Sequence, residues 1–495
     1  METILLQRFT RARFGTQTCL RSATTRFVSN RNAHLSQTHS LFWHQRFATS
    51  TEVSSSFNQS DTGSTITKPA QKRTRPLIAL GIETSCDDTC AAIVTSDRQI
   101  LSEVLRTQHH LHEPMGGIVP KLAHHAHMRN LPEVVKEAIQ KAGLGERGIQ
   151  EIDIIAVTRG PGLAHCLGVG LNAAKTLAAA LNKPLIGVHH MEAHALTARL
   201  TTRDPATDQD QASSDIVPIG SDPYPSFPFL TLLVSGGHTL LLVAHSVDRY
   251  TTLATTVDDS IGEAIDKTAR ELDIPWLPGR AGGPGASLEE FAKGSQDPTR
   301  YLDRLPIPMS LRNNKWEMKF SFAGVKSAAT RIVNQEKSTS PTGEMDEEKK
   351  KDLAAGFQNC AVAHLCQKVE QGLMDCRKQG LEISSLVISG GVGRNATLRS
   401  KIEEVCNQFD SRAMKASKPA GRRASAATEG TSAATEVPRQ PVQVICPPPK
   451  LCTDNAVMIA WTGLERYQQG LVDPYDIDIA PKWPLDMLGT GVVPE

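Results

Sequence analysis

The hydrophobic and polar positions of the chain form alternating blocks that predict strands followed by helices. Short apolar runs predict buried strands, and longer segments with an apolar residue every three to four positions predict helices. In the first half, the expected strands are 77–82, 91–95, 100–106, 152–157 and 185–188, and the expected helices are 120–142, 163–181 and one that begins near His190. This order indicates an α/β protein.

The same order of elements begins again at Phe229. The expected strands of the second half are 229–234, 239–244, 386–389 and 442–446, and the expected helices lie near 261–272, 284–293, 321–335, 346–377, from Asn395 and over 453–468. In each half an apolar strand ends in a turn with an acidic or glycine residue and leads into a hairpin, at 77–106 and at 229–256. This repetition indicates two related lobes.

Some segments lack this periodicity. Residues 201–228 are polar and rich in Pro and Asp, which predicts a solvent loop. Residues 411–441 are of low complexity and poor in large apolar side chains, so they cannot bury enough surface to offset their ordering entropy. The expected division is a leader of residues 1–75, an N-terminal lobe of 76–223 with a polar loop at 201–222, and a C-terminal lobe of 224–495 with a disordered insertion at 411–441.

The leader differs from the rest of the chain in charge. It holds eleven Lys or Arg residues and three acidic residues, which leaves 43 basic and 50 acidic residues, a net charge of −7, for 76–495. An Arg-rich, Ser/Thr-rich and acid-poor N-terminus is typical of a mitochondrial transit peptide. The alternative is a disordered basic tail that binds nucleic acid. A secretory signal is disfavoured, because no apolar stretch follows the first charges.

The composition is ordinary for a soluble globular protein, with 39% hydrophobic and 22% charged residues among 495. No uncharged apolar run reaches about 18 residues, so neither a transmembrane helix nor a membrane partner is expected. The ten cysteines include no CxxC pair, which argues against a disulfide framework and against a four-cysteine zinc site. This cysteine usage fits a reducing compartment such as the mitochondrial matrix.

Three glycine-containing turns directly follow apolar strands: GIETSCDDT at 81–89, VSGGHT at 234–239 and SGGVGRN at 389–395. Glycine lets backbone N–H groups approach an anion, and helix starts add free donors. One such turn usually only reverses the chain. Three at strand ends, spread over both halves, indicate a nucleotide cleft of the kind found in actin, Hsp70 and sugar kinases.

A pair of histidines suggests a metal site. His190 and His194 are four residues apart, so on a helix they share one face, as two imidazole ligands of one ion do. Asp454, at an expected strand-to-helix turn, is the candidate third ligand. Two histidines and one carboxylate leave open positions for a substrate. Without a metal, the pair would simply be two histidines at a helix start. A thiol mechanism at Cys86 is disfavoured, because no histidine is adjacent in sequence.

The chain also resembles a known family through nine motifs in the same order. They are GIETSCDDT, GGIVPKLAHHAH, GPGLAHCLGVG, KPLIGVHHMEAH, LLVSGGHT, DDSIGEAIDKTAREL, KFSFAGVKS, ISGGVGRNATLR and CTDNAVMIAW. Together they are similar to the universal tRNA threonylcarbamoyladenosine transferase family, formerly labelled O-sialoglycoprotein endopeptidase or glycoprotease. With the transit-like leader, the similarity is to the mitochondrial members. It covers roughly 77–490.

The resemblance implies a two-lobed actin/Hsp70-like fold, a duplicated ribonuclease-H-like architecture with a nucleotide cleft between the lobes. It implies an acyltransferase of tRNA modification. This enzyme would take threonylcarbamoyl-AMP from a separate synthase, transfer the acyl group to N6 of the adenosine immediately 3′ of the anticodon, and release AMP. A homodimer is expected, and so is one divalent metal ion per subunit, iron or zinc.

The resemblance also assigns site residues. The metal ligands would be His190, His194 and Asp454. The adenylate would contact Leu233, Val234, Ser235, Gly236 and Gly237, with Asp266 and Gly283 near the ribose and Asn395 near the phosphate or base. Asp87 or Asp88 is the guess for the group that removes the N6 proton. Two departures from the family pattern are Asp88, where Glu is common, and Arg394, where a small residue is usual.

Two other functions remain alternatives. A metal-dependent (glyco)protease needs a general base beside the metal, and here Glu192 lies between the histidines at an offset that differs from HExxH. A non-catalytic ATP-binding module would lack the histidine pair. A net acidic mature chain must bind tRNA through a local basic patch. The candidates are Lys121, Arg129, Lys136, Lys141 and Arg147.

Overall fold

The computed structural model describes residues 75–115, 117–202, 224–275, 277, 283–308, 317–416 and 441–490. The leader up to residue 74 lies outside these ranges, as do residues 203–223 and 417–440 of the two polar segments. The expectations for those segments therefore stay predictions. The described residues begin at Arg75, shortly before the first strand, and the side chain of Arg75 donates to the carboxylate of Asp153.

The first half forms a five-stranded mixed sheet of order β3-β2-β1-β4-β5. β1 (Ile78–Glu83) pairs antiparallel with β2 (Asp88–Thr95), which pairs antiparallel with β3 (Ile100–Thr107). β4 (Ile154–Gly160) and β5 (Leu185–His189) run parallel to β1. A meander on one side of the central strand and crossover strands on the other is the ribonuclease-H-like arrangement.

The two faces of this sheet bury different helices, because alternate residues of a strand point to opposite faces. Leu80 and Ile82 of β1 pack with α2 (Pro120–Lys141) and α3 (Ala164–Leu181), whereas Ala79 packs with α4 (His190–Thr201) and α10 (Ala456–Gln468). α10 touches β1 so closely that a Cβ on Gly81 would lie 2.3 Å from the backbone oxygen of Ala456. Only glycine permits this approach.

The second half repeats the arrangement in a six-stranded sheet of order β11-β10-β6-β7-β8-β9. The antiparallel strands are β6 (Phe229–Val234), β7 (Thr239–Ala244) and β8 (Tyr250–Thr256). On the other side of β6, β10 (Ser385–Ser389) and β11 (Gln443–Ile445) run parallel to it. The short β9 (Lys319–Phe320) extends the edge beside β8. The prediction of two related α/β lobes is confirmed.

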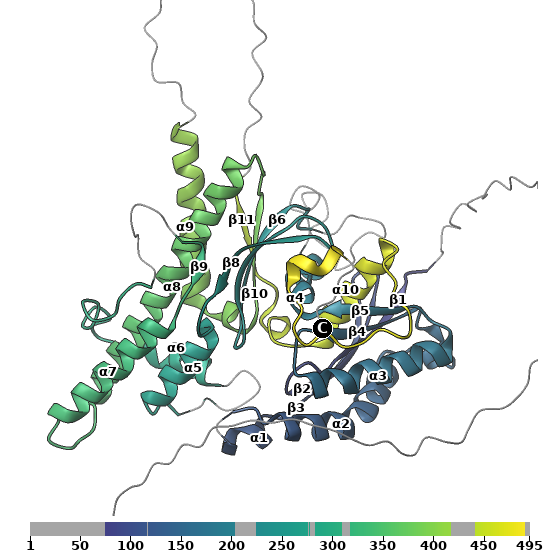
Figure 1. Cartoon of the computed structure of the whole chain (residues 1–495), viewed down its shortest axis with the longest axis horizontal. Helices are drawn as coiled ribbons and strands as arrows, with labels where there is room; N and C mark the ends of the chain where they lie inside the picture. Colours follow the sequence, from purple (N-terminus) through teal and green to yellow (C-terminus); the bar gives the residue numbers. More distant parts are fainter. Residues whose placement is uncertain are drawn as a thin grey trace, which may run out of the picture. The chain divides into compact units, whose positions relative to one another are not determined.

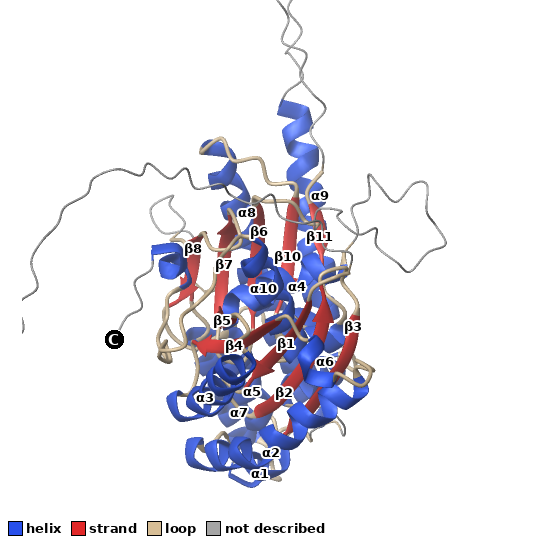
Figure 2. Ribbon diagram, turned by 90° about the vertical axis from the view of Figure 1, so that its right-hand side faces the viewer, coloured by secondary structure: helices blue, strands red, loops and turns tan. Residues whose placement is uncertain are grey.

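α4 and α10 lie between the two sheets (Figures 1 and 2). One core cluster contains residues of both helices, residues of β1 and β4, and residues of β6, β7 and β10. The opposite face of the second sheet is covered by α5 (Ile261–Glu271), α6 (Pro284–Ala292), α7 (Ala323–Thr339), α8 (Glu347–Lys378) and α9 (Ala396–Ala416). α10, which the sequence predicted over 453–468 in the second half, packs on the sheet of the first half as well as on the sheet of the second half.

The element boundaries follow the hydrophobic pattern closely, with a few differences. α9 continues to Ala416, so the first residues of segment 411–441 are helical; Ala, Met and Lys favour helix, and Pro419 follows shortly afterwards. The pattern did not predict β9, the short helix α1 (His109–His112) or the 3-10 helices η1 (Glu113–Met115), η2 (Gly148–Glu151), η4 (Gly391–Arg394), η5 (Pro449–Leu451) and η6 (Leu485–Thr490). Elements this short carry no periodicity.

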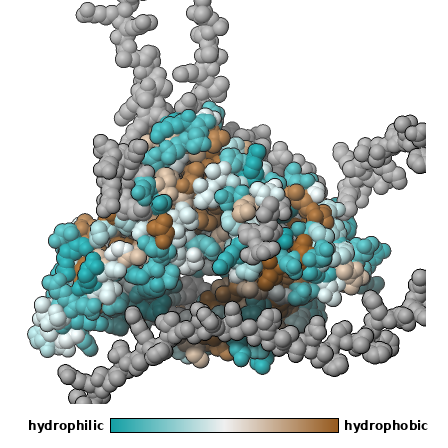
Figure 3. All heavy atoms as spheres, viewed as in Figure 1, coloured by the Kyte–Doolittle hydropathy of each residue, from teal (hydrophilic) through white to brown (hydrophobic). Residues whose placement is uncertain are grey.

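One face of the described part is mostly polar. In the view of Figure 3, hydrophilic and neutral residues cover most of the visible face, and hydrophobic ones show as scattered patches. Among the described residues, no helix has the length and apolar character needed to cross a bilayer.

Candidate metal and nucleotide site

The two histidines of the predicted metal site lie on the first turns of α4. The helix begins because His189 caps it: its Nδ1 accepts the N–H of Met191 at 3.1 Å, and its own N–H donates to Glu192 at 3.3 Å. His190 and His194 then lie one turn apart, with ring centroids separated by 4.8 Å. They share one face of the helix, as the spacing predicted, and both imidazoles are buried.

Asp454 meets these histidines from α10. It directly precedes Asn455, whose side chain caps the helix by accepting the N–H of Met458 at 2.9 Å. Oδ1 of Asp454 lies 3.3 Å from Nε2 of His190 and 3.2 Å from Nε2 of His194. Two ligands of one tetrahedral ion at about 2.0–2.1 Å would be about 3.3 Å apart, so the three groups fit a single ion. The structure brings all three predicted ligands together.

Glu83 orients the first of these ligands. Its Oε2 lies 3.2 Å from Nδ1 of His190, and the hydroxyl of Thr158 donates to the same carboxylate. Burial opposes protonation of His190, but the carboxylates of Asp454 and Glu83 raise its pKa to about 10. A proton held at Nδ1 by Glu83 leaves Nε2 free for an ion, the usual carboxylate–histidine arrangement. The sequence analysis missed Glu83, although an acid at the end of β1 was a visible signal.

Two buried ion pairs fasten α4 to α10. Arg199 donates to Glu465 at 2.9 Å, and Arg466 lies 3.2 Å from Glu192. Glu192 is fully buried, and its carboxylate also caps α4. Through these contacts Glu192 helps to hold the starts of α4 and α10, which carry the predicted metal ligands. Its carboxylate is thus already bonded to Arg466 and to the N–H of His189. These contacts disfavour Glu192 as the general base that the protease alternative requires.

The end of the chain supports the same region. The carbonyl of Trp483 accepts Nε2–H of His189 at 2.8 Å, and the two rings lie 4.9 Å apart. Burial lowers the pKa of His189 to about 3, so this cap stays neutral. Residues upstream hold the segment to the first sheet: the N–H of Ala480 donates to Arg159, and Asp473 accepts the N–H of Gly187. Sequence patterns gave no signal for this long-range support.

The first glycine turn approaches the predicted metal ligands through Ser85, whose hydroxyl lies 3.4 Å from Nδ1 of His190, and Asp87 and Asp88 follow in the same turn. Both side chains are half-exposed, and Asp88 begins β2. Their role in proton removal stays a prediction. The neighbouring Cys86 is a poor nucleophile, because burial and then the charge of Asp87 raise the pKa of its thiol far above the usual value. This agrees with the expectation that no thiol mechanism operates.

The second turn offers backbone and hydroxyl groups to a ligand. Leu233 and Val234 are 2% and 0% exposed, so little of either residue is open to an adenylate in this structure, and their predicted contacts stay predictions. Gly236 and Gly237 are exposed and border open space. Ser235 stabilises the turn by accepting the N–H of His238 at 3.1 Å.

The third turn packs directly on the second. Gly390 has φ +93°, and a Cβ on it would lie 2.4 Å from the carbonyl oxygen of Val234. A side chain at this position would therefore be excluded both by conformation and by space. On the other side, a Cβ on Gly391 would lie 3.9 Å from Thr453, the residue before Asp454. The second and third turns and the metal ligands thus form one continuous region.

The remaining predicted contacts lie on α5, α6 and α9. Asp266 accepts the N–H of Gly285, so it lies beside the start of α6, where Gly283 has φ +155°. Burial raises the pKa of Asp266 to about 6. Asn395 is 8% exposed and already engaged: it caps α9 by accepting the N–H of Leu398, and it donates to Gln358. Its contact with a nucleotide stays a prediction.

Comparison with known proteins identifies the family. The family model described as tRNA N6-adenosine threonylcarbamoyltransferase matches residues 99–208 and 216–419. The chain belongs to this family. A probable mitochondrial member from Arabidopsis thaliana is 37% identical, covering 83% of this chain and 75% of its own. A member from Paramagnetospirillum magneticum is 36% identical over 83% of this chain and 97% of the relative. A mitochondrial member from Xenopus tropicalis is 35% identical over 80% of this chain and 84% of the relative.

Membership of the threonylcarbamoyltransferase family confirms the predicted family, enzyme class and action on tRNA. The presence of mitochondrial members among the relatives supports a mitochondrial location. The expected metal ion is supported by the ligand cluster, whereas its identity is a matter for proposal. Solved structures align only distantly, for example a ROK hexokinase from Thermus thermophilus at 15% identity and TM-score 0.37, over 80% of this chain and all of that one.

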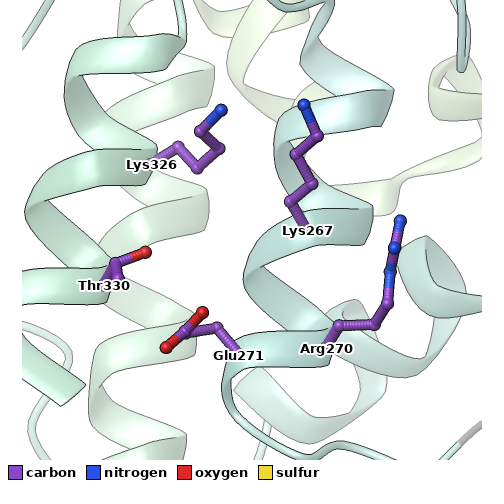
Figure 4. Close-up of a pocket in the computed structure, with 5 residues that line it drawn as sticks. All are labelled: Lys267, Arg270, Glu271, Lys326 and Thr330. Atoms are coloured by element: carbon purple, nitrogen blue, oxygen red, sulfur yellow. The ribbon is translucent and has the colours of Figure 1, made fainter. Parts of the chain in front are cut away.

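A pocket of about 380 Å³ lies between α5 and α7 (Figure 4). Its lining residues are Lys267, Arg270, Glu271, Lys326 and Thr330, none of them a predicted site residue. Lys267 and Lys326 extend side by side from the two helices, and both form ion pairs with Asp259. Because Asp259 and Glu271 offset this positive charge, we assign no anion site here.

The predicted tRNA patch on α2 is smaller than the sequence suggested. Lys136, Lys141 and Arg147 form exposed ion pairs with Glu133, Glu137 and Glu151. Lys121 and Arg129 are exposed and form no ion pair with other described residues. These two cations are therefore the stronger candidates for phosphate contacts.

Proposed function

We propose that this chain transfers the threonylcarbamoyl group from threonylcarbamoyl-AMP to N6 of the adenosine immediately 3′ of the anticodon in mitochondrial tRNAs, and releases AMP. Membership of the family supports the reaction class. The observation that carries the proposal is the cluster of His190, His194 and Asp454 beside glycine turns with an open face. One part of this site suits a metal, and the other suits an adenylate.

The residues divide the chemistry between them. The N6 amine of adenosine is a weak nucleophile, so a metal ion at His190, His194 and Asp454 would supply Lewis-acid polarisation of the acyl carbonyl. Glu83 would keep the proton of His190 at Nδ1 and hold the ring in place. Backbone groups around Gly236 and Gly237 would bind the AMP part and stabilise the charge that develops as it leaves. Asp87 or Asp88 would accept the N6 proton.

The ligand set narrows the choice of metal without fixing it. Two imidazoles and one carboxylate suit zinc as well as iron, because both accept nitrogen and oxygen ligands and both leave open positions in such sites. We propose one ion of either kind per subunit. Metal analysis of the purified protein would identify which of the two is bound.

The partners and the location form part of the same proposal. We propose that a separate synthase supplies the donor, that the reaction takes place in the mitochondrial matrix, and that residues 1–75 direct import and are dispensable for folding. We further propose a homodimer. Exposed apolar side chains on and before α2, at Met115, Ile118, Leu122 and Met128, are consistent with a protein interface there.

The test is a transfer assay with purified residues 76–495. The protein is loaded with zinc or iron and given threonylcarbamoyl-AMP and a mitochondrial tRNA transcript, and the product nucleoside is measured by mass spectrometry. A matched transcript carrying guanosine at the target position serves as control. Transfer to the adenosine transcript alone supports the proposal. No product with either metal would refute it, and so would cleavage of casein by the same preparation in place of transfer.

A further inference from the structure

Arg394 is a partly buried cation without an ion-pair or hydrogen-bond partner in the part of the chain that the structure describes. It is the last residue of η4, in the third glycine turn. Its side chain forms no ion pair and no hydrogen bond with any other described residue. A guanidinium stays charged at every physiological pH, and partial burial removes part of its hydration. An anion from outside the chain would therefore stabilise Arg394.

The turn places this arginine beside the proposed adenylate site. η4 begins between two contacts already described, Gly390 against Val234 and Gly391 against Thr453. Val234 ends the strand that leads into the exposed glycines of the second turn. Thr453 precedes the metal ligand Asp454. Arg394 therefore follows directly on the segment that joins the two parts of the site.

The turn is held in a defined conformation. Arg399 donates from Nε to the carbonyl oxygen of Gly393 at 2.6 Å, and the N–H of Gly393 donates to Gly390 at 2.9 Å. Burial raises the pKa of the Cys452 thiol, and the charges of Arg399 and then Arg394 oppose this rise. Both guanidinium groups therefore lie near Cys452, two residues before Asp454. Arg399 is committed to the turn, whereas Arg394 is not.

We propose that Arg394 binds a phosphate group at the glycine turns, namely the phosphate of the AMP part of the donor. The inference rests on the proposed function and adds a contact to it, at a position where a small residue is usual in the family. A guanidinium can bind two phosphate oxygens at once, and such charge-assisted bonds are the strong ones. A tRNA phosphate offers the same chemistry, so the experiment separates the two sources.

The experiment compares Arg394→Ala and Arg394→Lys with wild type, and uses Arg304→Ala as the matched control. Arg304 is also a partly buried arginine, but it stacks on Tyr301 and bonds Gln335, away from the turns. AMP and adenosine are titrated calorimetrically. We expect Arg394→Ala to weaken AMP binding about 10- to 100-fold, the worth of a charged hydrogen bond, with adenosine binding unchanged. Arg394→Lys should lose less AMP affinity than Arg394→Ala, and Arg304→Ala should bind AMP like wild type.

Binding of tRNA at several salt concentrations forms the second arm. If Arg394→Ala leaves AMP binding unchanged but lowers the salt dependence of tRNA binding by about one phosphate contact, the phosphate belongs to tRNA. Wild-type binding of both AMP and tRNA by Arg394→Ala would overturn the inference. Transfer activity of the wild-type protein, measured on the same preparation, separates the proposed reaction from the proposed role of Arg394. If wild type is active and Arg394→Ala binds AMP and tRNA normally, only the role of Arg394 is refuted. If wild type is inactive but Arg394→Ala weakens AMP binding, only the reaction is refuted.

Discussion

Arg466 on α10 lies 3.2 Å from Glu192 on α4, the glutamate between the two histidines of the proposed metal site. This buried pair joins the helix that carries His190 and His194 to the helix that begins after Asp454. It also disfavours the acidic residue between the histidines as a proteolytic base. Breaking a buried pair by removing one partner leaves an uncompensated charge in the core.

The first prediction concerns this pair. Arg466→Met should lower the free energy of unfolding by about 3–5 kcal/mol, and the double variant Glu192→Gln/Arg466→Met should recover much of that loss. Chemical denaturation of the three proteins measures both effects, with the exposed pair variant Lys141→Ala as control. Glu192→Gln alone should keep transfer activity wherever it is folded. A folded but inactive Glu192→Gln protein would return Glu192 to a catalytic role.

The second prediction concerns the metal ligands. His194→Ala and Asp454→Asn should each bind less than stoichiometric metal and lose transfer activity, because each removes one of the three proposed ligands found among the described residues. Metal content by elemental mass spectrometry and transfer are measured on the same samples. His165→Ala, which changes an exposed histidine of α3, should retain both. Full activity in a metal-free Asp454→Asn protein would contradict the Lewis-acid role.

The third prediction concerns Glu83. Glu83→Gln removes the carboxylate charge beside Nδ1 of His190 while keeping its shape, and should weaken metal affinity about 10- to 100-fold. Competition with a chelator of known affinity gives the number, and thermal unfolding checks the fold. Unchanged metal affinity in a folded variant would show that Glu83 does not orient the ligand.

The strand and helix order was predictable from the sequence, and so was part of the site. The spacing of His190 and His194 needs only helical geometry, and Asp454 stands where a strand-to-helix turn displays a side chain. Glu83 was missed because its partner lies 107 residues away. Likewise, an apolar face on α10 indicates that the helix is buried, but not that it is buried between two sheets.

The fourth prediction concerns pH and Asp266. Burial raises the pKa of this carboxyl to about 6 in the folded protein, above its value in the unfolded chain. The folded state then binds a proton that the unfolded state releases, so stability falls as pH rises from about 4 to 6. Relative to Asp266→Asn, the free energy of unfolding of wild type should fall by up to about 1.4 kcal/mol per pH unit in this window and stay level at higher pH. Chemical denaturation at several pH values measures the difference in unfolding free energy between the two proteins. A difference that does not change with pH would contradict the raised pKa.

The most direct test of the central claim is mass spectrometry of nucleosides from mitochondrial tRNA. Cells in which the gene is disrupted are compared with the same cells carrying either the wild-type gene or the Asp454→Asn variant. The account predicts that threonylcarbamoyladenosine disappears from mitochondrial tRNAs on disruption, returns with the wild-type gene, and does not return with Asp454→Asn. Persistence of the modified nucleoside in the disrupted cells, or its full recovery with Asp454→Asn, would contradict the account.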